Sequence, residues 1–352
     1  MNLLRNTRKA LRAVGRMNPY AIAVTTALLA ITALAAVAGA GRATPPDRNG
    51  QIAFQRYVFQ DHPLQADIFV ANADGSGERS VTRAPHGLID GEPDWSPDGE
   101  RIVFQRCVTV DGPCTIWSVN ANRTGARRLT PRGAKKCVDE TSPAFAPDGK
   151  TIAFECLTRR RGQLIFSVVA MDRDGGNRRV VVHGTSAAGV GRPQFSPDGR
   201  RLVFEHQNIK AKPKNGHATY VVNLDGTGMR RVTPWSLRAG DHPDWSPDGS
   251  LILVRSLANG PDFSHQGNLY TVRPDGSGLR QLTHVGPRVN LLQNGSFSPD
   301  GTAIVFATTS GSIKRNHSNL PDVFTVDVGA TGLRPVTRSR NWDGSADWGP
   351  AR

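Results

Sequence analysis

The sequence lacks several features that would mark an enzyme or a metalloprotein. Of its 352 residues only four are cysteine, and no two cysteines have the C-x-x-C spacing of zinc or thioredoxin-like sites. It also has no G-x-S-x-G element, so the nucleophile elbow of an α/β-hydrolase is missing. No long stretch between Asn49 and Arg352 places apolar residues at helical spacing. We therefore expect a protein that is not an enzyme and that holds no cofactor or metal ion.

Charge is absent from one long segment near the N-terminus. Residues 17–41 carry no charged side chain and are nearly all apolar, whereas Met1–Arg16 contains five basic residues and no acid. A basic flank followed by an apolar run is typical of an export signal. The run approaches the roughly 20 residues that span a bilayer, and Ala38-Gly39-Ala40 offers a cleavage site.

Residues 1–40 are therefore expected to be a signal peptide or an N-terminal membrane anchor, and both options stay open. Residues 41–49 are expected to be a linker. Because the positive end of such a segment stays in the cytoplasm, the body should lie outside it, anchored to the membrane or secreted.

The net charge of the whole chain is +14, and 39 basic residues face 30 acidic ones once the five of the leader are set aside. The basic residues are spread through the chain as arginine pairs and form no single block, so we expect no nucleic-acid partner. Attraction to anionic envelope polymers or to lipid headgroups remains an alternative to a purely solubilising role.

The cysteines fit an oxidising compartment. Cys107 and Cys114 flank a candidate hairpin loop, and Cys137 and Cys156 bracket a repeat junction. Of the three possible pairings we predict the disulfides Cys107–Cys114 and Cys137–Cys156. A zinc site is the alternative, and no nearby histidine pair supports it.

Two motifs recur through the chain at one shared period. The first is an aromatic residue before a turn of the Ser-Pro-Asp-Gly kind, with steps of 50, 50, 50, 52 and 51 residues between the copies at Trp95, Phe145, Phe195, Trp245, Phe297 and Trp348. The second resembles "DGSGLRQLT" and also occurs six times, starting at Asp74, Asn122, Asp174, Asp225, Asp275 and Gly329. A fixed period of this length predicts a repeat architecture.

Each repeat reads as four short strands. Proline and glycine suit the corners of the first turn, and the next strand is apolar on the consecutive residues Ile102, Val103 and Phe104, as in a strand buried on both faces. The body begins with a second strand at Gly50, and the missing first strand occurs at the other end, from Ser345. We therefore predict an all-β, six-bladed β-propeller over residues 50–350, closed by its C-terminal strand.

These repeats resemble those of the TolB-like six-bladed β-propellers, relatives of the WD40-like propellers. The resemblance rests on "WSPDG" with the following I-x-F and on "DGSG-x-x-x-LT", and it covers residues 49–350. It implies the fold. It implies less about activity, because the family includes a translocation protein, peptidase propeller domains, sugar lyases and envelope proteins.

Candidate binding residues lie where the repeats differ. Three positions before the aromatic, all six copies are polar and are not uniform: Glu92, Ser142, Arg192, His242, Asn294 and Ser345. We expect this position at the mouth of the central channel and predict a ligand site there. The candidate set is Glu92, Asp90, Asp94, Ser142, Arg192, His242, Asp244, Asn294 and Asp343. A water-filled channel and a metal bound by Glu92, Asp90 and His242 are the alternatives.

Two functions are compatible with this pattern. One is a monomeric exported or membrane-anchored scaffold that binds a protein or an envelope polymer through its variable loops. The other is a polysaccharide-acting enzyme of the lyase or hydrolase kind that works at the channel mouth.

Overall fold

The structure is a computed structural model that describes residues 48–58, 64–110, 112–130, 137–210, 216–256, 267–284, 290–309 and 320–352. The predicted leader 1–40 and almost all of the linker 41–49 lie outside these residues. Within the described residues no helix is long and apolar enough to cross a membrane.

The described chain is built from strands and one 3-10 turn, η1 (Trp235–Leu237). The strands are β1 (Asn49–Val58), β2 (Gln65–Ala71), β3 (Arg79–Ser80), β4 (Ile89–Trp95), β5 (Arg101–Cys107), β6 (Cys114–Asn120), β7 (Arg127–Arg128), β8 (Asp139–Phe145), β9 (Thr151–Arg160), β10 (Gln163–Asp172), β11 (Arg179–Val182), β12 (Ala188–Phe195), β13 (Arg201–Asn208), β14 (Gly216–Asn223), β15 (Arg230–Arg231), β16 (Asp244–Trp245), β17 (Ile252–Arg255), β18 (Leu269–Val272), β19 (Arg280–Gln281), β20 (Asn290–Phe297), β21 (Ala303–Thr309), β22 (Asp322–Asp327), β23 (Arg334–Pro335) and β24 (Trp342–Pro350).

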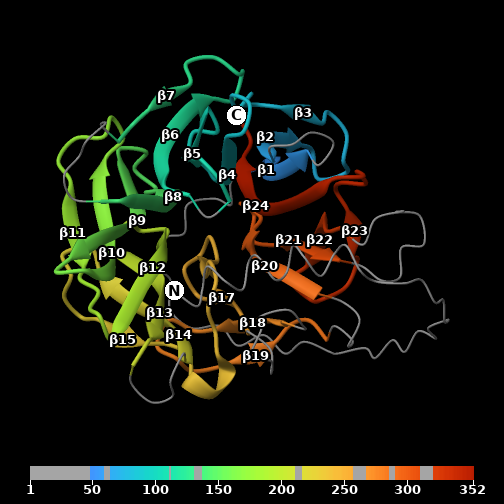
Figure 1. Cartoon of the computed structure of the whole chain (residues 1–352). Coiled ribbons are helices and arrows are strands. Elements are labelled where there is room, and N and C mark those ends of the chain that lie inside the picture. The colour runs from blue at the N-terminus through green and yellow to red at the C-terminus, as the bar shows by residue number, and fades with distance from the viewer. Residues whose placement is uncertain are drawn as a thin grey trace, which may run out of the picture.

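Strand pairing divides these strands into six antiparallel groups of four, which are the blades. Four groups are separate sheets, β8–β11, β12–β15, β16–β19 and β20–β23. The other two, β24-β1-β2-β3 and β4-β5-β6-β7, are joined by a single parallel pair, Ala66 with Ile89. The blades follow one another around a central axis, as Figure 1 shows, so the predicted β-propeller is confirmed.

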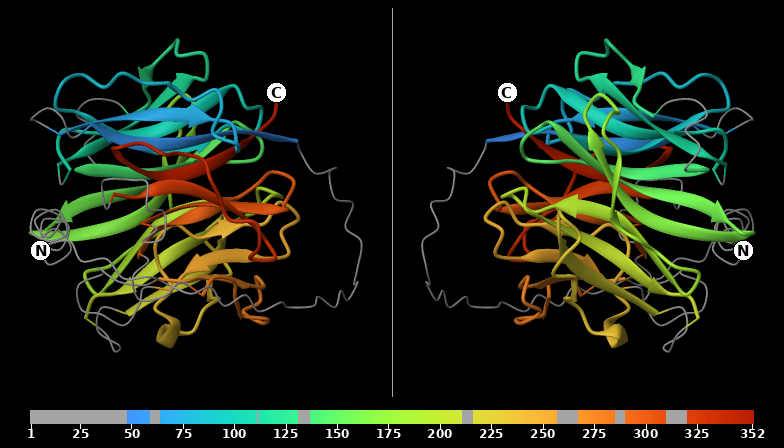
Figure 2. Two further views of the ribbon diagram at one scale, coloured as in Figure 1. Left: turned by 90° about the vertical axis from the view of Figure 1, so that its right-hand side faces the viewer. Right: turned by 90° about the vertical axis from the view of Figure 1, so that its left-hand side faces the viewer.

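The C-terminal strand completes the N-terminal blade, as the sequence predicts. β24 pairs antiparallel with β1, and Ile52 lies opposite Trp348. The two ends of the described chain therefore meet in one sheet, the red and blue strands side by side in Figures 1 and 2. This pairing satisfies the inner edge of β1, which would otherwise be open to another chain.

The core lies between neighbouring blades. The second strands are buried on both sides: Ile102, Val103 and Phe104 are fully inaccessible to solvent, and so are the residues at the same places in the next blades. The repeat aromatics are also buried, and Trp95, on β4, packs in one cluster with Ile68 and Val70 from β2 of the preceding blade. Apolar contact between blades is therefore the main source of stability.

The repeated turns lie on one face of the ring. In the first of them the amide of Gly99 donates to the carbonyl of Ser96 (2.9 Å), and Gly99 has φ +66°, which favours glycine. We call the side that carries the Ser-Pro-Asp-Gly and Asp-Gly turns the turn face. The opposite side, where β3 leads to β4 and β9 to β10, is the loop face.

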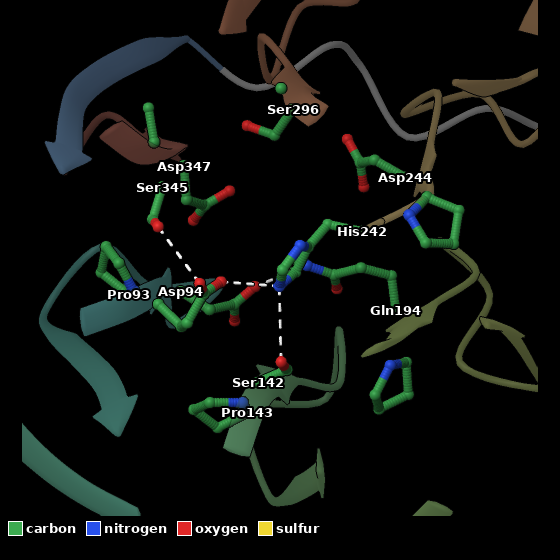
Figure 3. Close-up of a pocket in the computed structure, with 15 residues that line it drawn as sticks. Pro93, Asp94, Ser142, Pro143, Gln194, His242, Asp244, Ser296, Ser345 and Asp347 are labelled. Carbon is green, nitrogen blue, oxygen red and sulfur yellow. Dashed lines mark hydrogen bonds and ion pairs between the residues drawn. The ribbon is translucent and has the colours of Figure 1, made fainter. Parts of the chain in front are cut away.

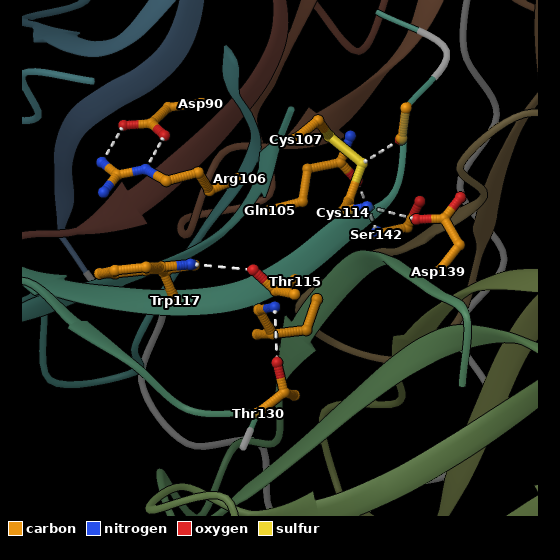
Figure 4. The surroundings of a disulfide bond; sticks show 12 residues. Asp90, Gln105, Arg106, Cys107, Cys114, Thr115, Trp117, Thr130, Asp139 and Ser142 are labelled. Carbon is orange, nitrogen blue, oxygen red and sulfur yellow. Dashed lines mark hydrogen bonds and ion pairs between the residues drawn. A yellow bond between two sulfur atoms is a disulfide. The ribbon is translucent and has the colours of Figure 1, made fainter. Parts of the chain in front are cut away.

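Both predicted disulfides are confirmed. Cys107 pairs with Cys114 at the end of the β5–β6 hairpin (Figure 4), and Cys137 pairs with Cys156 on β9. Disulfides of this kind are typical of oxidising compartments outside the cytoplasm. No described cysteine is free.

Removing residues 342–352 should abolish cooperative folding. The deletion strips the inner edge of β1 and removes Trp348, whose side chain fills the gap between the last and first blades. Loss of one such aromatic alone costs about 3–5 kcal/mol. Thermal unfolding by circular dichroism measures the effect, and a chain lacking only Ala351 and Arg352 is the control. An unchanged midpoint in the longer truncation would contradict ring closure by β24.

Candidate functional site

A β-bulge occurs at the same place in the innermost strands. Pairing with the second strand shifts between Gly91 and Asp94 in β4, and equivalent shifts occur in β8, β12, β20 and β24. The residue three before the aromatic is in this bulge and has a positive φ of 47° to 53° in the copies Glu92, Ser142, Arg192, His242 and Ser345. A bulge turns its side chain out of the ladder, and here the side chains enter the channel. The structure thus places this position midway along the strand, inside the channel and deeper than the predicted mouth.

An ion pair spans the ring. Glu92 is in the second blade and His242 is in the fifth, on the opposite side of the axis, yet His242 Nε2 lies 2.6 Å from Glu92 Oε2. Ser142 Oγ lies 3.4 Å from the same imidazole nitrogen (Figure 3), and Ser345 Oγ donates to Glu92 Oε1 at 3.2 Å. Residues of this position from four blades therefore meet at the axis and cross the channel.

Arg192 extends this network along the fourth and fifth blades. Its guanidinium contacts Glu205 at 2.8 Å and Asp241 at 2.9 Å. Asp241 also accepts from Arg255 at 2.7 Å and lies 3.0 Å from His242 Nδ1. Each of these charged groups thus has an opposite charge within hydrogen-bonding distance, which compensates the cost of burying it.

The network shifts the ionisation of its members. Burial disfavours the charged form of His242, but Glu92 and Asp241 outweigh it and raise the His242 pKa to about 10. Burial likewise opposes ionisation of Glu205, but Arg192 and His217 lower its pKa to about 2. The raised pKa favours a protonated imidazole between the carboxylates of Glu92 and Asp241 at neutral pH.

A second tier of side chains lies one residue before each aromatic and is polar in every copy but Ala144. Asp94 accepts from the backbone amide of Phe145 in the next blade at 2.7 Å, and Asp244 accepts from that of Phe297 at 2.8 Å. The same bond recurs at two further boundaries, from Trp95 to Asp347 and from Trp348 to Ser296. These bonds join neighbouring blades around the axis.

The two tiers line a small polar pocket of about 50 Å³. Its lining comes from the innermost strands and comprises Glu92, Pro93, Asp94, Ser142, Pro143, Pro193, Gln194, His242, Pro243, Asp244, Gly295, Ser296, Ser345, Ala346 and Asp347 (Figure 3). A water molecule needs at least about 10–15 Å³, and pockets for organic ligands are about 300–1,000 Å³. The cavity can hold a few waters or one small ion, and it is too small for a sugar residue.

The acids of the lower tier resist ionisation. Burial raises the pKa of Asp244 to about 7, and its neighbour Asp347 adds to the effect. Burial and the charge of Asp347 also raise the pKa of Asp94. A protonated carboxyl can still accept through its carbonyl oxygen, so the bonds between blades do not require charge.

Two predicted site residues lie apart from the cavity. Asp90 is fully buried and bound by Arg106 through two contacts of 2.5 and 2.7 Å (Figure 4), and Asp343 is held in the same way by Arg56. In both pairs an acid of the first strand faces an arginine of the second strand. Asn294 lies on β20, and its side chain is outside the described residues. Arg192 joins the ion-pair network next to the cavity.

The sequence analysis did not identify the polar residues of the second strands that lie beside the channel. Glu205 and Arg255 directly follow the apolar run of their strands, as do Gln105 and Glu155 in other blades. Gln105 accepts from the amide of Ser142 at 3.0 Å, and burial raises the pKa of Glu155 to about 7. The available signal was a polar residue repeated at this place in strands that are otherwise apolar on both sides.

No group of three or more histidine, cysteine, aspartate or glutamate residues in the described parts of the chain is arranged to hold a metal ion. Of the three ligands in the metal alternative, Glu92 and His242 are in contact with each other. The third, Asp90, is instead paired with Arg106.

Comparison with known proteins agrees with the strand arrangement. A family model described as the TolB beta propeller domain matches residues 138–325, more than half of the chain. The chain belongs to the TolB beta propeller domain family. The resemblance inferred from the repeats is thereby confirmed, and the family's blades are those formed by the 50-residue repeat.

Several solved structures share the fold. TolB from Acinetobacter baumannii is 18% identical with a TM-score of 0.65, over 86% of this chain and 67% of that one. The putative TolB from Agrobacterium tumefaciens is also 18% identical, with a TM-score of 0.59 over 84% of this chain and 92% of that one. Hydrazine synthase of Kuenenia stuttgartiensis is 14% identical, with a TM-score of 0.64 over 86% and 46%. Such identities show the fold alone, and a search of curated proteins found no similar sequence.

Replacing Glu92 with glutamine should lower the pKa of His242, because the largest opposing charge is lost. Since the folded pKa lies above the unfolded value of 6.5, the stabilisation is complete below pH 6.5 and is lost as the pH rises toward 10. The free energy of unfolding of Glu92→Gln should therefore change less over this interval than that of the parent. Nuclear magnetic resonance titration of His242 and denaturant unfolding measure both effects. Identical titration curves would contradict the cross-channel ion pair.

Asp244→Asn should stabilise the protein at pH 8 and have little effect at pH 4. The raised pKa, about 7 against 3.8 for an ordinary aspartate, means that ionisation opposes folding as the pH rises through this range. Asparagine keeps the acceptor for the Phe297 amide, so the gain should be about 1 kcal/mol or more. Urea unfolding at the two pH values measures it. Asp248→Asn, on an exposed turn, is the control, and an equal change in both variants would contradict the assignment.

Proposed function

We propose that this chain is an exported propeller scaffold that binds a protein or an envelope polymer through its loop face. The observation that carries the proposal is the ion pair of Glu92 and His242 across the channel, beside a pocket of about 50 Å³. Because this pair occupies the axis, a large partner must bind on an outer face. Of the two faces, the turn face repeats in every blade and the loop face varies, which favours the loop face for specific recognition.

The place of the N-terminal segment supports the same face. Asn49, where β1 begins, exchanges two hydrogen bonds with Asp300 in a Ser-Pro-Asp-Gly turn (2.9 and 3.1 Å). The preceding residues therefore join the propeller on the turn face. If residues 1–40 are retained as an anchor, the linker of nine residues reaches roughly 30 Å at most. The loop face would then point away from the membrane, toward the envelope.

The enzymatic alternative has less support. A polysaccharide would have to reach Glu92 and His242, but these side chains bind each other and the cavity below them cannot admit a sugar. Export and an oxidising environment are supported by the basic and apolar leader and by the two disulfides.

Site-specific photo-crosslinking in intact cells tests the proposal. A photoreactive amino acid at Val138, exposed on the loop face, should capture the partner. The matched control is Met229, which is equally exposed but lies beside a turn on the turn face. Adducts from position 138 and none from position 229 are the expected result. Adducts only from position 229 would overturn the assignment of the face.

A further inference from the structure

The exposed acids among the described residues are confined to one face, whereas exposed cations occur on both. Every exposed acidic residue in the described parts of the chain lies on the turn face, in or beside the repeated turns: Asp74, Glu78, Asp98, Glu100, Asp148, Asp174, Asp198, Asp225, Asp248 and Asp275. Acids also occur near the loop face, but they are turned inward. Asp67 accepts from the amide of Ala84 there, Asp90 and Asp343 bind arginines, and Glu140 binds Arg178.

Where the structure describes the loop face, no exposed acid accompanies its exposed lysines and arginines. They come from four places, which are the segment after β3, the end of β9 with its turn to β10, the connection between β13 and β14, and the segment before β24. They comprise Arg83, Arg159, Arg160, Arg161, Lys210, Arg338 and Arg340. Within the described residues none of them forms an ion pair. The turn face also carries arginines, such as Arg230 and Arg280, but these are interspersed with its exposed acids.

We infer that the loop face binds a linear anionic polymer of the cell envelope, one whose repeated carboxylate or phosphodiester groups contact these cations. The inference deepens the proposed function and rests on it. Guanidinium groups bind oxyanions through paired hydrogen bonds, and cations set on separate blades suit a partner that follows the rim of the ring.

The composition of this face favours a polymer over a protein or a lipid surface. Its exposed large apolar side chains, among the residues described, are Val108 and Val138, and neither is aromatic. Protein interfaces are enriched in aromatic residues at their centre, and surfaces that insert into lipid usually present tryptophan, phenylalanine or leucine. A dispersed set of arginines instead provides many charge contacts of modest individual strength.

Binding of the full chain to two probes tests the inference: alginate, which carries carboxylates, and long-chain polyphosphate, which carries phosphates. The double variant Arg159→Gln and Arg160→Gln should bind at least one probe about tenfold more weakly. The slope of log K against log salt should also be shallower by about two in this variant. Each lost phosphate or carboxylate contact removes roughly one unit from that slope. Arg338→Gln with Arg340→Gln, on another blade, should behave alike.

The matched control removes the same charge from the opposite face, in Arg230→Gln with Arg280→Gln. It should bind as the parent does. Equal weakening in this control would mean that only the net charge matters and would overturn the inference. So would binding to vesicles containing phosphatidylglycerol with no binding to either polymer. If neither polymer binds but crosslinking at position 138 captures an acidic protein, the polymer inference fails and the proposed function stands.

Discussion

One kind of inter-blade contact holds the ring at four of its blade boundaries: the side chain before a repeat aromatic accepts the backbone amide of the next aromatic. Asp347, Asp94, Asp244 and Ser296 make this bond at four blade boundaries. Each buried amide needs an acceptor, and here the neighbouring blade supplies it. The aromatic is thereby held against the preceding blade, where its burial contributes most of the stability. Asp94, Asp244 and Asp347 make this contact from buried positions around the axis. Burial raises the pKa of all three carboxyl groups.

Closing the ring at its axis has consequences for the outer surface. In the inner strands β4, β8, β12 and β24 a bulge holds one residue at a positive φ, and Glu92 with His242 joins opposite blades. The polar centre is thus used for closure, with little room for a ligand. Because the two turn motifs carry aspartates, the repeat itself places exposed acids on one face. The other face carries the connections that vary, and the acids described there are buried on arginines or backbone amides. Among the residues that the structure describes, the exposed charges of the loop face are therefore all basic.

The sequence predicted the architecture well because the repeat determines it. The spacing of the aromatics gives the blades, the C-terminal copy from Ser345 gives the closure, and the cysteine positions give both disulfides. It predicted the candidate site less well. Glu92 and His242 are 150 positions apart. The repeat indicates that they hold equivalent places in two blades, but it does not predict that their side chains are in contact. Asp90 resembled a site residue because its partner Arg106 lies on the next strand and is recognised only through the register.

Our central claim is that partners bind on the loop face of a propeller whose channel is crossed by the ion pair of Glu92 and His242. Hydrogen–deuterium exchange of the full chain with and without saturating alginate tests this claim most directly. It predicts slower exchange in peptides covering residues 82–88 and 157–165 and no change in the turn peptides 72–78 and 225–229. Slower exchange confined to the turn peptides, or to the inner strands around residues 92–94 and 242–244, would contradict it.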